Sequence, residues 1–229
     1  MERVILFSKA PRLDGVKTRM APRLSAAEAL VLYEAMLQDQ VEFVKALRGP
    51  DRECEVCLDR LFAPTEGLSQ ALADLPQTLQ ADGDLGARME RALARAFRDG
   101  VQRAAIVGAD APTLPRDLLE RAFAKLGDGA DAVIIPAHDG GYVLVGASRL
   151  VPGIFEGVPW GTPSVADATR RLAAGRGIVL AETAPWPDVD LATDLPRLAD
   201  ELAADPARAP ATVQALTRLG LYGPQNPVV

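Results

Sequence analysis

The stretch Val-Ile-Leu-Phe-Ser-Lys-Ala-Pro-Arg-Leu-Asp-Gly-Val-Lys-Thr-Arg, residues 4–19, joins an apolar run to a basic segment. The run at 4–7 predicts a buried first strand. Residues 9–23 hold five of the chain's 25 Lys and Arg residues but only one of its 31 acidic residues, Asp14. A loop that leads from such a strand toward a helix can aim N–H groups and cations at phosphate. We therefore expect an anion-binding loop for a phosphorylated or nucleotide ligand, the alternative being a solvated basic loop on an acidic protein.

The composition is that of a globular protein. With 229 residues, 48% of them hydrophobic and 24% charged, one domain over residues 1–229 suffices, with a short, loosely held tail from about residue 223. The net charge of −6 argues against a surface devoted to nucleic acid. No apolar run long enough for a membrane span and no signal peptide is visible, so we expect a cytoplasmic protein without nucleic-acid or membrane partners. The sequence does not indicate an oligomeric state.

Helical and strand patterns alternate along the chain. Residues 25–28, Ser-Ala-Ala-Glu, match a capping box and precede apolar residues at helical spacing as far as Val44. The run at 104–108 is apolar without alternation, as expected of a strand covered on both faces. The other expected helices are a short one after Pro64 and those at 85–96, 118–126, 164–174 and 194–203, and the other expected strands lie near 53–58 and at 132–136, 142–145 and 178–180. This order predicts an α/β fold of three layers around a mostly parallel, mixed sheet.

The two cysteines form a C-x-x-C pair, Cys54 and Cys57, inside an expected strand. Spacing of three in a strand places the thiols on opposite faces. Ordinary buried thiols are therefore favoured over a metal or redox site.

Three aspartates are the candidate metal ligands. Asp110 follows the buried strand and precedes Pro112, which places it at the carboxyl edge of the sheet. Asp188 and Asp190 share a face if extended and come just before a helix start, where Asp194 suits a cap. Mg²⁺ commonly uses one or two carboxylates and completes its shell with phosphate oxygens. We expect Mg²⁺ or Mn²⁺ here, with Asp188 as readily a solvated loop residue.

Other segments leave two interpretations open. The Asp139-Gly140-Gly141-Tyr142 segment is a strong turn signal, but its glycines also permit close approach of a ligand and Tyr142 can stack or hydrogen-bond. Asp84 suits a helix cap, while Arg88 faces either a ligand or solvent. The segment Trp-Gly-Thr at 160–162 suits either an acceptor-pocket wall or a packed loop.

Taken in order, the motifs resemble a known family. They are F-S-K-A-P and V-K-T-R at 7–11 and 16–19, G-D-L-G-A-R-M at 83–89, G-A-D-A-P-T-L at 108–114, D-G-G-Y-V-L-V-G at 139–146, W-G-T at 160–162 and D-V-D-L-A-T-D-L at 188–195. Across nearly the whole chain they are similar to the GT-A-fold, nucleotide-diphospho-sugar-transferase-like proteins called radical-SAM/selenodomain-associated transferases or arsenosugar-biosynthesis glycosyltransferases. A smaller part resembles 2-phospholactate guanylyltransferases. One position departs from the family pattern, because the family usually has its loop glycine where Asp14 stands and this chain has Gly15.

The resemblance implies a Rossmann-like GT-A fold and a role for each matching position. It implies that Asp110 and Asp190, with Asp188 nearby, hold the divalent cation. It also implies that Lys9, Lys17 and Arg19 contact donor phosphates. With the candidates named from the residues themselves, the expected donor-binding set is Lys9, Lys17, Thr18, Arg19, Asp84, Arg88 and Tyr142. The expected partners are a nucleotide sugar or nucleoside triphosphate as donor and a small-molecule acceptor.

Two reactions suit these residues. Inverting glycosyl transfer needs a carboxylate to deprotonate the acceptor, and Asp139 is the best candidate base. In nucleotidyl transfer Lys17 and Arg19 would spread the charge that develops on a triphosphate, with little need for a base. The single aspartate in G-A-D-A-P favours the second reaction, while the whole-chain resemblance favours glycosyl transfer, which we expect. A protein that only binds nucleotide is a third and weaker alternative.

Overall fold

The computed structural model describes residues 1–223, so the part of the predicted tail at 224–229 lies outside the described residues. One seven-stranded sheet has the order β3-β2-β1-β4-β6-β5-β7. Its strands are β1 (Glu2–Ser8), β2 (Arg52–Leu58), β3 (Gln77–Leu79), β4 (Arg103–Gly108), β5 (Ala132–Pro136), β6 (Tyr142–Ala147) and β7 (Leu180–Glu182). The predicted mixed α/β sheet is confirmed.

Parallel pairing places β1 between β2 and β4, and β2 pairs with β3 in the same way. The exception is β6, which is antiparallel to both β4 and β5. Residues 137–141 alone join β5 to β6, and a parallel return would need a crossover of a dozen or more residues. Because β1 and β4 are parallel neighbours, the loops that follow them emerge side by side at one edge of the sheet.

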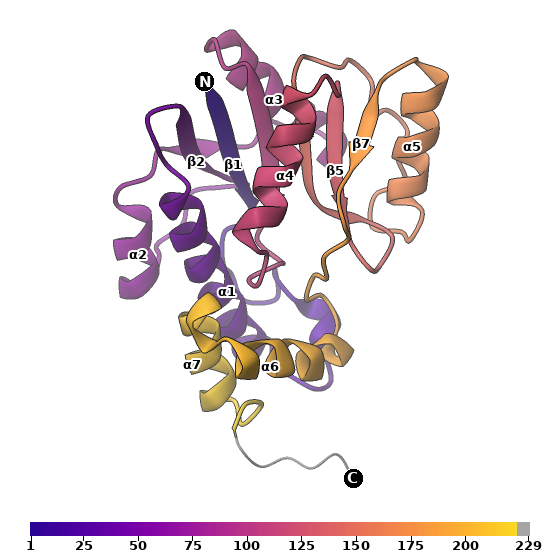
Figure 1. Cartoon of the computed structure of the whole chain (residues 1–229). Helices are drawn as coiled ribbons and strands as arrows, with labels where there is room; N and C mark the ends of the chain where they lie inside the picture. The colour runs from indigo at the N-terminus through magenta and orange to yellow at the C-terminus, as the bar shows by residue number, and fades with distance from the viewer. Residues whose placement is uncertain (224–229) are drawn as a thin grey trace.

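Helices cover both faces of the sheet (Figure 1). They are α1 (Ala26–Ala46), α2 (Glu66–Leu72), α3 (Leu85–Arg98), α4 (Arg116–Gly127), α5 (Val165–Gly175), α6 (Leu195–Ala204) and α7 (Pro210–Arg218). Side chains of α1, α2 and α4 share one core cluster with the sheet, and those of α3 and α5 share another with its opposite face. These two clusters make the three expected layers.

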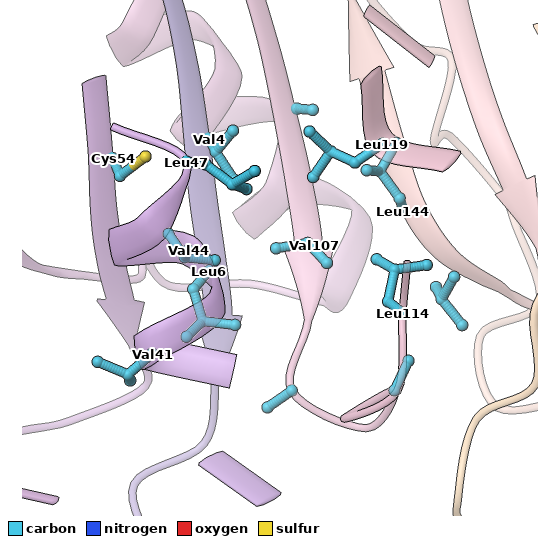
Figure 2. Close-up of a cluster of buried hydrophobic side chains, with 14 of the residues drawn as sticks. Val4, Leu6, Val41, Val44, Leu47, Cys54, Val107, Leu114, Leu119 and Leu144 are labelled. Atoms are coloured by element: carbon cyan, nitrogen blue, oxygen red, sulfur yellow. The ribbon is translucent and has the colours of Figure 1, made fainter. Parts of the chain in front are cut away.

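The larger core cluster shows why alternate strand residues are apolar. Val4 and Leu6 of β1 point to the α1 face with Val107 of β4, and Val41 and Val44 of α1 pack onto them (Figure 2). Burial of such side chains stabilises the fold by about 1.5–3 kcal/mol each. The predicted capping box also forms, since the Ser25 side chain accepts from the Glu28 N–H at 3.3 Å and Glu28 accepts from the Ser25 N–H at 2.8 Å. It fixes the start of α1 beside the loop that follows β1.

The last two helices form a layer of their own beyond the carboxyl ends of the strands (Figure 1). Leu198 and Leu202 of α6 and Leu216 of α7 are fully buried in a third cluster with Leu32 and Met36 of α1. The sequence predicted α6, entered through Pro196, but it gave no prediction for α7. The segment before α6 carries the Asp188 and Asp190 carboxylates, so this layer holds them against the end of the sheet.

Both cysteines are free and buried, on opposite faces of β2. Cys54 lies in the cluster with α1 and Cys57 in the cluster with α3, as the strand spacing predicted. Burial raises the pKa of the Cys54 thiol to about 11, so it is protonated at neutral pH. The thiols are packing residues.

The last strand begins two residues later than expected, at Leu180 instead of Ile178. The Val179 N–H donates to the Asp131 side chain at 2.9 Å, which ties Val179 to the residue before β5. Val179 itself is 59% exposed. No helix among residues 1–223 is long and apolar enough to cross a membrane.

Candidate functional site

The loop after β1 is fastened at both sides. The Tyr33 hydroxyl of α1 donates to the Lys9 carbonyl at 3.0 Å, and Asp59, just after β2, accepts from the Ala10 N–H at 2.6 Å. Asp59 also accepts from Arg12 at 2.9 Å. Burial alone would raise the pKa of Asp59, but the hydrogen bonds from Ala10 and Arg12 outweigh it and hold the pKa below its usual range. The predicted basic loop is therefore an ordered segment, and Arg12, one of its five cations, is paired with Asp59 after β2.

Two non-glycine residues of this loop have left-handed backbone conformations, Asp14 at φ 55° and Lys17 at φ 50°. Aspartate is among the residues that tolerate this region. The neighbouring Gly15 has no positive φ, but a Cβ there would lie 2.3 Å from the Arg12 side chain. Asp14 thus has the left-handed conformation at this turn, and Gly15 provides the room for the Arg12 side chain.

The Lys17 side chain turns inward and is only 3% exposed. Its ammonium contacts the Asp110 carboxylate, the Val189 carbonyl at 2.6 Å and the Asp190 carboxylate at 2.9 Å. Burial lowers the pKa of Lys17, but the two carboxylates outweigh it and raise the pKa above its ordinary value. An ammonium has three protons, and all three are used here.

A second group of carboxylates lies beside this ion pair. One oxygen each from Asp139, Asp188 and Asp190 lie within 4.8 Å of one another. Burial raises the pKa of Asp188 to about 7, with added repulsion from Asp139 and Asp190. The pKa of Asp190 is lowered, since Lys17 outweighs the opposing effect of burial. Three converging carboxylates suit a hard divalent cation, whose charge would offset the repulsion between them.

The carboxylates that converge differ in one member from the three predicted metal ligands. Asp188 and Asp190 converge as expected, but the third carboxylate is Asp139, which was the predicted base, while Asp110 pairs with Lys17. A backbone hydrogen bond from the Val189 N–H to the Asp110 carbonyl, 2.9 Å, joins the segments after β4 and before α6. Because it fixes both backbones, it determines which carboxylate faces the ammonium. The sequence alone could not supply that choice.

A cavity of about 520 Å³ opens over these groups. The predicted site residues that line it are Lys9, Lys17, Thr18, Arg19, Arg88, Asp110, Asp139, Tyr142, Asp188 and Asp190. Arg19 is 62% exposed and its guanidinium lies 3.8 Å from Asp190, so it is a cation that can turn toward a ligand. Asp84 is not among the lining residues; it caps α3 by accepting from the Ala87 N–H at 2.8 Å.

The Asp139 segment is both a turn and a wall of the cavity. The Asp139 side chain accepts from the Gly141 N–H at 2.8 Å, which closes the turn. Gly140, at φ 91°, touches the neighbouring loop so closely that a Cβ would lie 2.0 Å from the Pro163 carbonyl oxygen. Glycine is required here by the packing of two loops. The same contact brings residues 160–162 to the rim.

Aromatic side chains form the apolar side of the cavity. The Tyr142 and Trp160 rings meet edge to face with centroids 6.2 Å apart, and Trp160 also packs on Phe155. Thr162 lines the rim next to them. Burial raises the pKa of Tyr142, so its hydroxyl is protonated at neutral pH. The loop at 160–162 is thus packed and also lines the cavity. Its contact with an acceptor stays a prediction.

Sequence reasoning missed Gln80 and Tyr33 as lining residues. The Gln80 amide donates to the Ser8 and Cys57 carbonyls at 3.0 and 3.1 Å, and its oxygen accepts from Arg88 at 3.0 Å. Gln80 thereby ties the ends of β1 and β2 to the arginine of α3. Its position directly after β3, at the edge where the other candidates lie, was the signal that could have found it.

Comparisons with known proteins agree with this architecture. A protein from Desulfovibrio desulfuricans G20, provisionally described as a nucleotide-diphospho-sugar transferase, superposes with a TM-score of 0.82 at 28% identity over 95% of this chain and 96% of that one. A cytidylyltransferase from Leptospira borgpetersenii shares the fold, with a TM-score of 0.54 at 10% identity over 100% and 99% of the two chains. A nucleotidyl transferase from Methanothermobacter does so with a TM-score of 0.54 at 18% identity over 90% and 99%.

No curated protein matches the sequence. The fold is that of the nucleotide-diphospho-sugar transferase structures. Residues 43–162 match the family model described as uncharacterized protein conserved in bacteria, DUF2064. That match spans more than half of the chain, from the end of α1 to the Trp160 loop, and the chain therefore belongs to the DUF2064 family.

Proposed function

We propose that this protein is a metal-dependent transferase that takes a nucleotide-activated donor, and that it transfers a glycosyl group from a nucleotide sugar to a small-molecule acceptor. The observation that carries the proposal is the meeting of opposite charges in one cavity. Asp139, Asp188 and Asp190 converge on one side, and Arg19, Lys9 and Arg88 line the same space. A diphosphate bridged to a divalent cation is complementary to such a site.

The three converging carboxylates would hold Mg²⁺ or Mn²⁺. When bound, the cation would withdraw charge from the leaving diphosphate. Arg19, which is exposed and held only by a 3.8 Å contact with Asp190, would follow the phosphates. The aromatic wall of Tyr142 and Trp160 excludes water on the side where the acceptor would enter. The resemblance to arsenosugar-type glycosyltransferases and the 28% identity with the Desulfovibrio protein support glycosyl transfer.

Nucleotidyl transfer is the second candidate. It is favoured by the single aspartate after β4, because Asp110 has no second carboxylate two residues away and is itself paired with Lys17. The likeness to 2-phospholactate guanylyltransferases supports the same reaction. In this case the acceptor would be a small phosphate or carboxylate compound, and pyrophosphate would leave.

A thermal-shift screen of nucleoside triphosphates and nucleotide sugars, each with and without Mg²⁺, tests donor binding. A donor at 100 times its Kd adds about 2.7 kcal/mol to the stability of the folded state, so the right class raises Tm and does so only with the cation. Release of a nucleoside diphosphate during turnover supports glycosyl transfer, and release of pyrophosphate supports nucleotidyl transfer. If neither class raises Tm with Mg²⁺, the proposal is wrong.

A further inference from the structure

The Lys17 ammonium lies among three oxygens of the kind that bind a metal ion. We propose that its ammonium is a fixed internal counterion for Asp110 and Asp190, so that the site takes its divalent cation at Asp139, Asp188 and Asp190 alone and leaves phosphate binding to the exposed cations. Lys17 is thus a positioning residue. The inference deepens the proposed function, on which the assignment of the metal rests.

The first argument is the donor count. The three ammonium protons face three acceptors, the Asp110 carboxylate, the Val189 carbonyl at 2.6 Å and the Asp190 carboxylate at 2.9 Å. A phosphate oxygen could gain a proton from Lys17 only by displacing one of them. Displacement would leave a carboxylate or carbonyl of the cavity without its hydrogen-bond donor, which is unfavourable.

The second argument is accessibility. The Lys17 side chain is 3% exposed, whereas the Arg19 side chain is 62% exposed. The Tyr33 ring, whose centroid lies 6.0 Å from the ammonium, adds a further attraction on the inner side. The Lys17 backbone is in the left-handed region, and its side chain leaves the loop toward Asp110, which follows β4. A ligand in the cavity meets Arg19 before it meets Lys17.

The third argument is the set of oxygens around the ammonium. Two carboxylates and a backbone carbonyl are hard ligands of the kind that bind divalent cations. Asp190 belongs to both groups, with one oxygen toward Lys17 and the other 3.8 Å from Arg19. The ammonium therefore holds Asp190 in place for the neighbouring cluster and at the same time fills what would otherwise be a second cation position.

The test counts Mn²⁺ ions per chain from the electron paramagnetic resonance signal of free Mn²⁺, without nucleotide. Lys17→Met ends the side chain at the ε position and so removes the ammonium from three oxygens. This variant should bind one more Mn²⁺ per chain than the wild type. Arg19→Met removes a cation of the same loop that is not enclosed by carboxylates, and its count should equal that of the wild type. An unchanged count in a folded Lys17→Met protein overturns the inference.

A second pair of variants tests the inference while the Lys17 ammonium is kept. Asp110→Asn should change the wild-type Mn²⁺ affinity by less than about threefold, whereas Asp188→Asn should lower it by more than about tenfold, which corresponds to about 1.4 kcal/mol. Equal losses in the two variants would make Asp110 a metal ligand and overturn the inference. The two failures can be told apart. If the wild type binds no Mn²⁺, the proposed function fails, whereas the inference is still tested by whether Lys17→Met gains one ion.

Discussion

At the scale of single residues, the site depends on backbone conformations that few side chains adopt. Asp14 at φ 55° has the conformation that glycine adopts without cost. Lys17 at φ 50° aims its ammonium between Asp110 and Asp190. Strain of this kind persists where the surrounding contacts determine it, and it clusters at functional sites. The sequence signalled the loop through its charge, but the left-handed position at Lys17 carried no glycine, asparagine or aspartate to reveal it.

Replacing Asp14 by glycine should therefore stabilise the protein. The left-handed region costs a residue with a Cβ roughly 1–2 kcal/mol, part of which the greater freedom of glycine in the unfolded chain offsets. We expect Asp14→Gly to raise the free energy of unfolding by up to about 1 kcal/mol and Asp14→Val to lower it, both measured by urea denaturation. A destabilised glycine variant would contradict the backbone assignment.

Asp188 should make the metal-free protein less stable as the pH rises. Its pKa of about 7 in the folded state lies above the value near 4 of an unfolded aspartate, so the folded chain holds the extra proton between these values. The contribution is fully present below about pH 4 and is lost as the pH rises through about 7, with a slope of at most about 1.4 kcal/mol per pH unit.

Urea denaturation in EDTA from pH 5 to pH 8 measures this slope, with Asp188→Asn as the reference protein. The asparagine variant should gain stability relative to the wild type as the pH increases, since it has no carboxyl group to ionise. A stability difference that does not change with pH would show that Asp188 titrates normally.

At the scale of elements, the helices with a clear apolar stripe were predictable and α7, which has none, was not. The pattern through Leu85, Met89 and Ala96 predicted α3, in which Met89 and Ala96 are buried and Leu85 is partly buried. By contrast α7 has nine residues, and its buried face consists of Thr212, Ala215 and Leu216. Two of these are small or polar, so no hydrophobic period reveals the helix. Its docking depends on a contact with α1 that lies far away in sequence.

That contact gives a prediction for Asp39 of α1. Its side chain is 6% exposed and accepts from the Ala211 N–H at 3.0 Å, the Thr212 N–H at 2.7 Å and the Thr212 hydroxyl at 2.6 Å. Carboxylates at a helix start satisfy free N–H groups and favour the positive end of the helix dipole.

Asp39→Ala should lower the free energy of unfolding by about 2–3 kcal/mol, because the N–H groups of α7 lose a charged acceptor while remaining partly buried. Hydrogen exchange should speed up in α7 before it does so in the sheet. Asp117→Ala is the control, since that carboxylate is 65% exposed in an i,i+4 pair and should change stability by less than about 1 kcal/mol. Equal protection of α7 in wild type and Asp39→Ala would contradict this account.

At the scale of the whole molecule, the sheet brings distant carboxylates and cations to one edge. Parallel order places the ends of β1 and β4 side by side, and the α6–α7 layer returns residues 188–190 to the same place. The alternation of elements predicted this meeting. It could not predict which carboxylate faces the ammonium, because side-chain directions follow from the hydrogen bond between Val189 and Asp110 and from the tight contact of Gly140 with Pro163. These contacts accompany the placement of Asp139, instead of Asp110, beside Asp188 and Asp190.

The most direct measurement is the anomalous scattering of crystals grown with Mn²⁺ and a nucleoside diphosphate. The account predicts one strong peak within reach of Asp139, Asp188 and Asp190, with the diphosphate between the ion and Arg19, and with Lys17 still on Asp110. A peak coordinated by Asp110, or a nucleotide bound away from this cavity, would contradict it.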